Sequence, residues 1–461
     1  MPRLALVSAL FVSAHAWAAP LVEPHVGGVV FVGATQGHVA ALAWNPASAA
    51  LLRGTHLFVD GQLKFDRFQI QRAPVGSADG EPSASGDLTF PEVADTRRSF
   101  AGFVGLSSDF GGNERFTLGL GAYVPYSDRP PAGGPVAYHA DGGTFYLPTF
   151  AVSASIRVTS SLYAGVSVHI GLPQIDVRFA RDAVLADCAA APCPVESAAG
   201  RQELRFLDDE QSPTGSFTLG ALLRTAGWWF GAAFTSKPFR PGEDSIPIST
   251  AVTLEQEGFA TRTGRARVRV ELPFIFRLGA RRILTEDWDA VADASLLMGY
   301  DQMLVIQPVG AMLTSAGLPE VLSRWQGRQT TVTLSAGLEQ SLDPERVLRF
   351  GARLFGETAA VPASGISAAQ VDGTRIGAAL GLEIRPLTQF AFGVGYSLGW
   401  HLARDVGESA FRPSDQIACN ASGFDLDICA PVREGRAIPS AAGEYQRLTH
   451  SLHATVSVDF W

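Results

Sequence analysis

The sequence has little charge and, after its first 20 residues, no long apolar run. Charged residues make up 18% of the chain, whereas 46% of the residues are hydrophobic and 48 are glycine. A transmembrane helix needs about 18 or more consecutive, mostly apolar residues, and no such run follows residue 20. A helical membrane protein is therefore excluded, and two classes remain: a large all-β protein in water and a transmembrane β-barrel.

An excess of basic residues is also absent. The chain has 36 Lys and Arg against 45 Asp and Glu, which gives a formal net charge of −9. Proteins that bind nucleic acid normally carry a basic surface that neutralises phosphates. We therefore expect no nucleic-acid partner.

The motifs of common enzymes and cofactor sites are missing. None of the nine histidines belongs to an H-E-x-x-H motif, no G-x-S-x-G elbow occurs, and no glycine-rich stretch carries the lysine of a P-loop. The sequence therefore predicts a protein that is not an enzyme and that has neither a cofactor nor a metal.

The first residues, MPRLALVSALFVSAHAWAAP, have the features of a secretory signal peptide. Arg3 supplies the charged start, residues 4–14 the apolar stretch, and Ala16-Trp17-Ala18 an A-x-A cleavage site. An ordinary first helix or strand is the alternative. We predict a signal peptide over residues 1–18 and therefore export from the cytoplasm.

Cysteine is scarce, and the four cysteines form two local pairs, Cys188 with Cys193 and Cys419 with Cys429. In an exported chain, such close pairs indicate small disulfide-closed loops. A zinc site is the alternative, but no histidine lies near either pair and the spacings do not match zinc motifs. We predict two disulfides.

What the chain does contain is a period-2 alternation of apolar and polar residues, the pattern of a two-faced β-strand. It is longest at 265–281, RARVRVELPFIFRLGAR, where every even position from Ala266 to Ala280 is apolar and the arginines hold odd positions. The other regular stretches are 55–66, 115–126, 149–158, 162–172, 347–356, 374–385, 389–402 and 445–461, and less regular ones are 99–109, 203–224, 228–240, 288–303 and 328–341. Fourteen strands result.

The connections between these strands alternate between short and long. The short ones are 110–114, 159–161, 225–227, 285–287, 342–346 and 387–388, and the long ones are 72–98, 127–144, 181–202, 241–264, 304–327, 357–373 and 404–444. Every second connection of an antiparallel meander lies at the same end, so all tight turns share one end. This asymmetry is typical of an outer-membrane barrel with extracellular loops and periplasmic turns.

A membrane location also explains the two faces of the strands. In hydrocarbon every backbone polar group must be paired, so a spanning sheet closes on itself. The apolar face then contacts outer-membrane lipid, and the charged face borders a water-containing lumen. Residues 265–281 are accordingly predicted to form one strand, with even positions toward lipid and odd positions toward the lumen. The aromatic C-terminus, Phe460-Trp461, suits insertion by the barrel-assembly machinery.

A segment of about 35 residues rich in Gly and Ala precedes the first strand. It contains Asn45-Pro46-Ala47 and an A-L-L-x-G sequence that leads into the strand at residue 55. Together with fourteen strands, the loop pattern and phrases such as residues 118–126 (LGLGAYVPY), this segment resembles the FadL/TodX family of outer-membrane transporters. That family carries long-chain fatty acids and other hydrophobic compounds.

The resemblance implies a closed barrel over residues 55–461 and an N-terminal hatch over residues 19–54 that folds into the lumen. It also implies passive uptake: capture by loops, passage to a pocket at the hatch, and lateral exit at a kinked third strand. That strand is 115–126 here, and Gly119, Gly121 and Pro125 are expected to lose pairing. The alternative is that the glycines face a crowded hatch. A monomer is expected.

A long alkyl ligand requires a continuous apolar surface, because burial contributes about 0.8 kcal/mol per methylene. The hatch offers Phe31 and Trp44. The connection 304–327 is predicted to form an amphipathic helix, and its apolar residues are Leu318, Val321, Leu322 and Trp325, with Met312 and Leu313 nearby. This helix either captures ligand or packs against neighbouring loops.

A carboxylate head group would be bound by arginine, which can form two parallel hydrogen bonds with it. The luminal candidates are Arg267, Arg269, Arg277, Arg349 and Arg353, with Arg269 and Arg277 favoured. The alternative is that these arginines pair with Asp and Glu across the lumen and hold the hatch. Two other functions also stay open, a surface-exposed binding or structural barrel and a general diffusion porin.

Overall fold

The structure is a computed structural model. It describes residues 25–74, 89–113, 115–182, 201–210, 212–243, 245–299, 303–310, 321–325, 327–342, 347–412, 419, 422, 425–430 and 440–460. Several predicted features lie outside these residues: the signal peptide 1–18, Cys188, Cys193, Met312, Leu313, Leu318 and Trp461.

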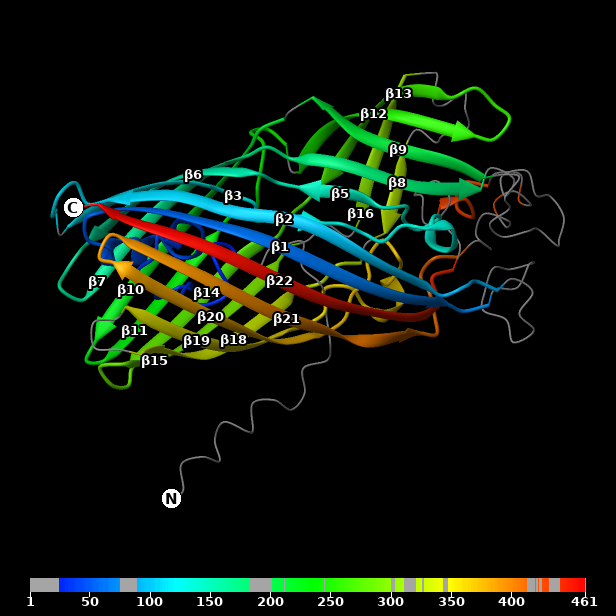
Figure 1. The fold of residues 1–461 in the computed structure, drawn as a ribbon. Helices are drawn as coiled ribbons and strands as arrows, with labels where there is room; N and C mark the ends of the chain where they lie inside the picture. Colours follow the sequence, from blue (N-terminus) through cyan, green and yellow to red (C-terminus); the bar gives the residue numbers. More distant parts are fainter. Residues whose placement is uncertain are drawn as a thin grey trace.

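Fourteen strands form one closed antiparallel barrel, as predicted from the alternation (Figure 1). In barrel order they are β1 (Thr55–Arg72), β2 (Val93–Ser108), β3 (Phe116–Tyr123), β6 (Thr149–Arg157), β7 (Leu162–Gly171), β10 (Thr214–Thr225), β11 (Trp228–Thr235), β14 (Phe274–Ile283), β15 (Trp288–Met298), β18 (Thr331–Ser341), β19 (Leu348–Glu357), β20 (Arg375–Leu387), β21 (Phe390–Val406) and β22 (Gly443–Phe460). Pairing of β1 with β22 closes the barrel.

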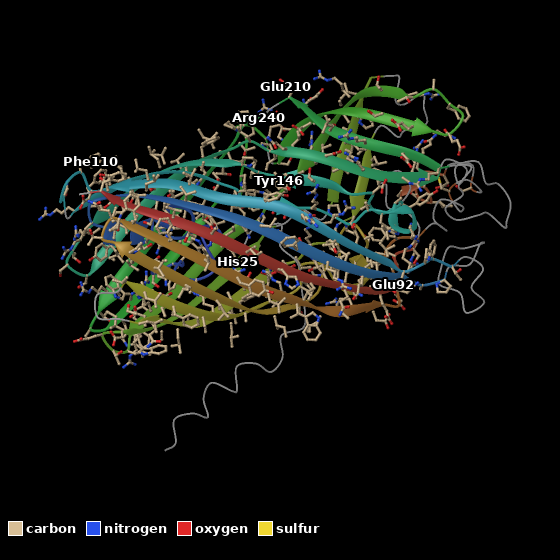
Figure 2. The ribbon with its side chains drawn as sticks, viewed as in Figure 1. His25, Glu92, Phe110, Tyr146, Glu210 and Arg240 are labelled. Atoms are coloured by element: carbon tan, nitrogen blue, oxygen red, sulfur yellow. A yellow bond between two sulfur atoms is a disulfide. The ribbon has the colours of Figure 1, made fainter. Side chains whose placement is uncertain are left out.

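The short turns share one end of the barrel. Thr55, at the start of β1, pairs with both Ser108 and Phe460, so the first strand begins beside the β2–β3 turn and the C-terminus. Figure 2 shows Phe110 of that turn at one end of the molecule and Glu92, which precedes β2, toward the other. The arrangement of turns follows from the alternation of short and long connections in the sequence.

A second antiparallel sheet of eight strands was not predicted from the sequence. Its order is β17 (Leu322–Trp325), β16 (Met303–Val309), β13 (Arg262–Val270), β12 (Ile246–Gln256), β9 (Arg201–Glu210), β8 (Gln174–Asp182), β5 (Gly143–Tyr146) and β4 (Ser127–Asp128). Each strand is joined directly to a barrel strand between β3 and β18, in the same spatial order. The second sheet therefore continues more than half of the barrel wall beyond the end that carries the long connections (Figure 1).

Prolines explain why the two sheets are separate. Proline has no N–H to give to a strand ladder, so it ends or bends a strand. Six of the eight joints between the sheets contain one, namely Pro125, Pro148, Pro173, Pro213, Pro238 and Pro273. Much of the sequence that looked like long loops therefore forms strands of the second sheet.

The prediction of one strand over residues 265–281 is wrong for this reason. The chain breaks at 271–273, which puts β13 in the second sheet and β14 in the barrel. In β14, Phe276 and Leu278 are exposed on the outer wall, as predicted. In β13, Ala266 and Val268 are buried instead, so Arg265 and Arg267 point to solvent and not into a lumen.

The two sheets have opposite polarity. The outer wall of the barrel is apolar, and its exposed side chains include Val168, Ile170, Phe392, Val394 and Trp400. Such a belt is typical of a surface in contact with lipid. In the second sheet the apolar side chains are buried in one core, which includes Phe145, Ile175, Phe179, Leu204, Phe206, Ile248 and Val268. Its exposed face is polar, which suits contact with water.

Helices are short in the described residues. They are α1 (Ala41–Trp44) and the 3₁₀ turns η1 (Pro46–Leu51), η2 (Gly134–Val136) and η5 (Ala363–Gly365). None of the helices that the structure describes is long and apolar enough to cross a membrane. The predicted amphipathic helix that includes residues 322–325 is wrong, because these residues form β17 and pair with β16.

One of the two predicted disulfides is present. Cys419 and Cys429 are bonded. This bridge lies in the connection between β21 and β22, which is one of the connections predicted to be long.

Candidate functional site

The N-terminal segment, residues 25–54, contacts the inward-facing side of the barrel strands. Asn45 is fully buried and serves as a connector. Its side-chain amide donates to the carbonyl oxygens of Ala34 (2.7 Å) and of Ala221 in β10 (3.0 Å). Its side-chain oxygen accepts the N–H of Ala47 (3.1 Å), which caps η1. The Asn-Pro-Ala sequence thus fixes a tight turn against the wall, with Pro46 at the first helical position.

Glycines on the wall allow this close approach. A Cβ at Gly165 of β7 would lie 2.5 Å from the backbone of Pro46 and Ala47, and one at Gly220 of β10 would lie 2.1 Å from the side-chain oxygen of Asn45. These distances are far below van der Waals contact. A larger residue at either position would therefore push the N-terminal segment away from the wall.

A charged cluster joins the segment to the wall between β15 and β19. Asp293 accepts the N–H of Ala34 through Oδ1 (3.0 Å) and lies 3.3 Å from Nη1 of Arg353 through Oδ2. Nη2 of Arg353 donates to Gln36 (3.2 Å) and to Glu339 (3.3 Å), and the amide of Gln36 also donates to Glu339. Arg353 therefore pairs with acids and holds the segment, which is the alternative role considered for the luminal arginines.

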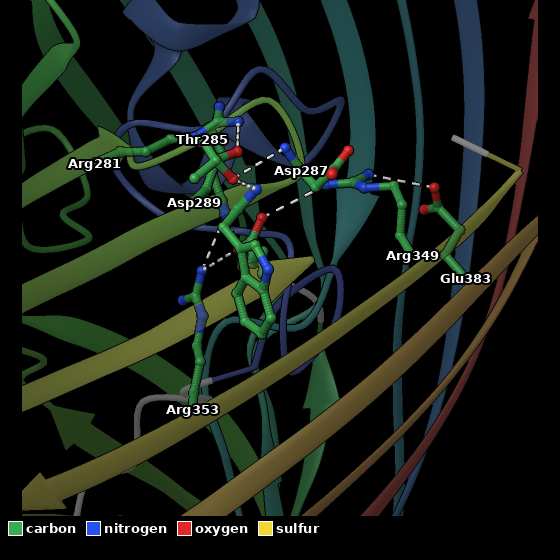
Figure 3. A network of polar contacts seen from close by, with 10 residues as sticks. Arg281, Thr285, Asp287, Asp289, Arg349, Arg353 and Glu383 are labelled. Carbon is green, nitrogen blue, oxygen red and sulfur yellow. Dashed lines mark hydrogen bonds and ion pairs between the residues drawn. The ribbon is translucent and has the colours of Figure 1, made fainter. Parts of the chain in front are cut away.

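Arg349 and Phe31 form a second connection. The guanidinium carbon of Arg349 lies 4.5 Å from the centre of the Phe31 ring. Arg349 also pairs with Glu383 at 3.3 Å, as Figure 3 shows, and with Glu339 at 3.5 Å. Phe31 has a left-handed backbone (φ 60°), an uncommon conformation for an aromatic residue. The ring packs with Val29, Val30 and Phe355, so it serves as part of the contact between segment and wall.

Arg277 and Trp44 lie at the meeting point of two internal cavities. The guanidinium carbon of Arg277 is 5.3 Å from the centre of the Trp44 ring, and the indole N–H donates to the carbonyl of Val26 (2.9 Å). Nη1 of Arg277 donates to the hydroxyl of Thr235 (3.1 Å). Among the described residues Arg277 forms no ion pair, which distinguishes it from Arg353 and from Arg375, the partner of Glu357.

Both cavities are small and partly apolar. The first has a volume of about 70 Å³, and its apolar lining residues are Val29, Val32, Trp44, Ile275, Leu297 and Phe355. The second has a volume of about 30 Å³ and lies at the level of the proline joints, between Trp44, Tyr123, Pro125, Tyr126, Leu147 and Ile275. Trp44, Ile275 and Arg277 border both cavities.

A third cavity lies beside the second sheet, nearer the long connections. It has a volume of about 120 Å³ and is bordered by Phe145, Ile175, Val177 and Val270 of that sheet and by Phe411. Asp128 and Asp176 add carboxylates. Burial raises the pKa of Asp128, whereas hydrogen bonds from Arg178 and Arg205 outweigh burial and lower the pKa of Asp176.

Of the other candidate residues that the structure describes, Arg353 borders the first cavity, whereas Arg269, Leu322 and Trp325 belong to the second sheet. Arg269 lies on β13 opposite Pro247 and Val305, away from Arg277. Leu322 is buried in the core of the second sheet, and the backbone of Trp325 pairs with Met303 at the edge of that sheet. Trp44 and Arg277 are therefore the predicted residues that meet at the first two cavities, and Phe31 contacts Arg349 elsewhere on the inner wall.

The predicted loss of pairing at Gly119 and Gly121 is wrong. Both residues are paired on each side of β3, with β2 and with β6. A Cβ at Gly121 would lie 2.8 Å from Leu42, so this glycine faces the N-terminal segment. The ladder ends at Tyr123, two residues before Pro125. Beyond that point β2 continues from Gly102 back to Val93, paired with β1 but not with β3.

Sequence reasoning missed two parts of the site. One is the apolar core of the second sheet, whose signal was the alternation at 246–254 inside a presumed loop, together with the prolines at the joints between the sheets. The other is a polar group around Tyr123 and His169, for which the sequence carried no signal because these side chains come from different strands. The described residues contain no group of three or more His, Cys, Asp or Glu that could hold a metal.

Comparison with known proteins identifies the fold. No protein-family model and no curated protein matches the chain. A FadL homologue from Pseudomonas aeruginosa has a TM-score of 0.76 at 14% identity, over 96% of this chain and 100% of that one. The toluene transporters TodX of Pseudomonas putida and TbuX of Ralstonia pickettii have TM-scores of 0.62 and 0.59 at 13% identity, over 96% of this chain and 98% of each. The chain therefore has the FadL-type fold that its motifs indicated.

Proposed function

We propose that the chain is a passive outer-membrane channel that takes up long-chain fatty acids or other hydrophobic compounds. Its fold is that of a FadL homologue and of two toluene transporters. The apolar outer wall of the barrel supports insertion in the outer membrane of a Gram-negative-type bacterium, where it contacts lipid. Removal of residues 1–18, insertion by the barrel-assembly machinery and a monomeric state complete the proposal.

The apolar lining along the inside is the observation that carries this function. It begins at the cavity beside the second sheet, where Ile175 and Phe145 also belong to the core of that sheet. The same core includes Ile275 and Leu297, which border the cavity at Trp44. A hydrophobic molecule captured near the long connections would thus meet apolar side chains at each step toward the N-terminal segment.

Residues 19–54 act as a hatch in this proposal, and residues 55–461 as the barrel. The contacts of Ala34, Gln36 and Asn45 with the inner wall support this division, and they argue against a general diffusion porin. The cavities at the hatch, of about 70 and 30 Å³, are smaller than the roughly 150 Å³ that admits benzene in other proteins. Passage of a ligand therefore requires the hatch to move.

Arg277 is the residue to bind a carboxylate. Arg277 is half-buried, and a cation withdrawn from water without an acidic partner is costly; a carboxylate would supply that partner in a bidentate arrangement. Trp44, Ile275 and the apolar lining would accommodate the alkyl chain. A neutral hydrocarbon would use the same lining without Arg277.

In this proposal the ligand leaves the lumen sideways at the end of β3, and not at Gly119 or Gly121. Tyr123, Pro125 and Tyr126 border the second cavity together with Trp44. Beyond Tyr123, the loop after β4 covers the edge of β2. Arg129 of this loop donates to the carbonyl of Arg98, and the N–H of Ala132 donates to Asp95 (3.0 Å). A loop can move aside more easily than a paired strand, so this edge is the proposed opening.

A photoreactive fatty-acid analogue tests the route. Irradiation of the purified protein with a diazirine analogue of oleate should label peptides that contain residues 26–44 and 275–277, and excess oleate should reduce the labelling. Labelling confined to the outer wall, or undiminished by oleate, would contradict the proposed site. As the matched control, an excess of glucose should leave the labelling unchanged.

A further inference from the structure

A chain of five polar side chains lies beside the second cavity, and all of them except Thr218 border it. Tyr123 Oη lies 3.1 Å from Nδ1 of His169, and Nε2 of His169 lies 3.0 Å from the hydroxyl of Thr218. The hydroxyls of Thr218 and Thr235 are 2.9 Å apart, and Arg277 donates to Thr235 (3.1 Å). These residues come from β3, β7, β10, β11 and β14, so the chain runs around the inner wall.

The register of the strands makes the chain continuous. Thr218 and Thr235 are direct partners in the ladder between β10 and β11, and Thr235 is the partner of Ile275, two residues before Arg277. Tyr123 must reach across β6 to meet His169. The residue of β6 opposite His169 is Ala151, whose small side chain leaves room for this contact. Tyr123, His169 and Thr218 are buried, so the hydrogen bonds that join these three residues are protected from water.

Donor and acceptor chemistry gives the chain a direction. Arginine can only donate, so Thr235 accepts from Arg277 and has its own proton to pass to Thr218. Thr218 then donates to Nε2 of His169, which leaves the imidazole proton on Nδ1 to be donated to Tyr123. In the opposite order, Thr235 would accept from both Arg277 and Thr218, and its own proton would need another acceptor. In the favoured order, Tyr123 holds a proton for a further acceptor.

We propose that Tyr123 is a second donor to the carboxylate head group of the ligand, and that His169, Thr218 and Thr235 position it relative to Arg277. Tyr123 and Arg277 both border the second cavity, and in this proposal one carboxylate placed there accepts from the phenol and from the guanidinium. Charge-assisted hydrogen bonds of this kind are stronger than neutral ones. This inference rests on the proposed uptake of fatty acids and specifies how the site distinguishes an acid from its ester or from a hydrocarbon.

The test compares binding of oleate with binding of methyl oleate, which has the same alkyl chain and no carboxylate. Equilibrium binding to the purified, detergent-solubilised protein should show that Tyr123→Phe weakens oleate at least fivefold and leaves methyl oleate within twofold of the wild type. His169→Phe, which breaks the chain without removing the phenol, should weaken oleate in the same way. His169→Gln, which can both donate and accept, should restore part of the affinity for oleate.

Tyr163→Phe is the matched control. Tyr163 is also buried on the inner wall but packs against Ala47 and Leu222, outside both cavities. Equal affinity of Tyr123→Phe and wild type for oleate would overturn the proposal, and so would equal weakening of oleate and methyl oleate. Failure of the wild type to bind either compound would instead contradict the proposed function itself. Loss of the preference for oleate in Arg277→Met but not in Tyr123→Phe would refute the role of Tyr123 alone.

Discussion

Asp293, on the barrel wall, accepts the backbone N–H of Ala34 through Oδ1 at 3.0 Å. Its other oxygen is 3.3 Å from Arg353, which reaches Gln36 two residues further along the N-terminal segment. The carboxylate of Asp293 thus binds the N-terminal segment directly and also orients Arg353, which binds the segment at a second point. The strength of this connection sets how readily the proposed hatch moves.

Replacing Asp293 with Leu should loosen the hatch. The change removes the acceptor of Ala34 and one partner of Arg353, and each buried polar group left unsatisfied costs about 1–3 kcal/mol. We expect a larger ion conductance in planar lipid bilayers than the wild type shows. Asp289→Leu is the control, because Asp289 of the same strand pairs with Arg281 near the turn and not with the hatch. Equal conductance of Asp293→Leu and wild type would show that the segment is held elsewhere.

Linking the hatch to the wall should block uptake. A Cβ at Gly381 of β20 would lie 3.1 Å from Cβ of Val30, close to the roughly 3.5–4.5 Å of a disulfide. Cells with Val30→Cys/Gly381→Cys are expected to lose oleate uptake when oxidised and to regain it with dithiothreitol. Each single cysteine variant and the wild type receive the same treatments as controls. Full uptake by the cross-linked protein would mean that the ligand passes without movement of the hatch at Val30.

Asn45→Ala should destabilise the turn that begins η1. The change leaves the carbonyls of Ala34 and Ala221 and the N–H of Ala47 without their partner. Because Asn45 is fully buried, water does not replace these bonds without local opening. Hydrogen exchange should become faster for the amides of residues 45–48, by tenfold or more. Asn113→Ala, in the exposed turn before β3, should leave this exchange unaltered.

Arg277→Met should separate acids from hydrocarbons. Methionine keeps the unbranched aliphatic part of the side chain but removes the guanidinium and its charge. Uptake of oleate by cells is expected to fall at least tenfold, whereas uptake of toluene stays within twofold. Arg269→Met is the matched control, since Arg269 lies on β13 outside the cavities. A parallel fall of both substrates in Arg277→Met would mean that the arginine only supports the fold.

The sequence predicted the barrel because its signal is local. Alternation with a period of two residues identifies a strand wherever one face is apolar, and all fourteen barrel strands contain such a stretch. Alternation does not, however, tell which face is inside. Ala266 and Phe276 belong to the same even series, yet the first is buried in the second sheet and the second is exposed on the outer wall. The proline at 273 carried the missing information about where the strand breaks.

Residues of the site could be predicted only where a motif or the phase of a single strand fixes their position. Trp44 beside Asn45-Pro46-Ala47, and an inward arginine in β14, could be placed from the motif and from the phase of one strand. Arg269 was misplaced because it has the same phase as Arg277 but lies on β13, on the other side of the break at 271–273. The contact of Tyr123 with His169 depends on the register of three strands, and a single sequence does not specify register across long connections.

Uptake of radiolabelled oleate is the most direct test of the central claim. A strain that lacks this gene should take up oleate or another hydrophobic compound more slowly than its parent, and a plasmid copy of the wild-type gene should restore the rate. Uptake of glucose should be the same in all three strains. If the strain without the gene takes up every hydrophobic compound tested as fast as its parent, the chain is not a channel for hydrophobic molecules.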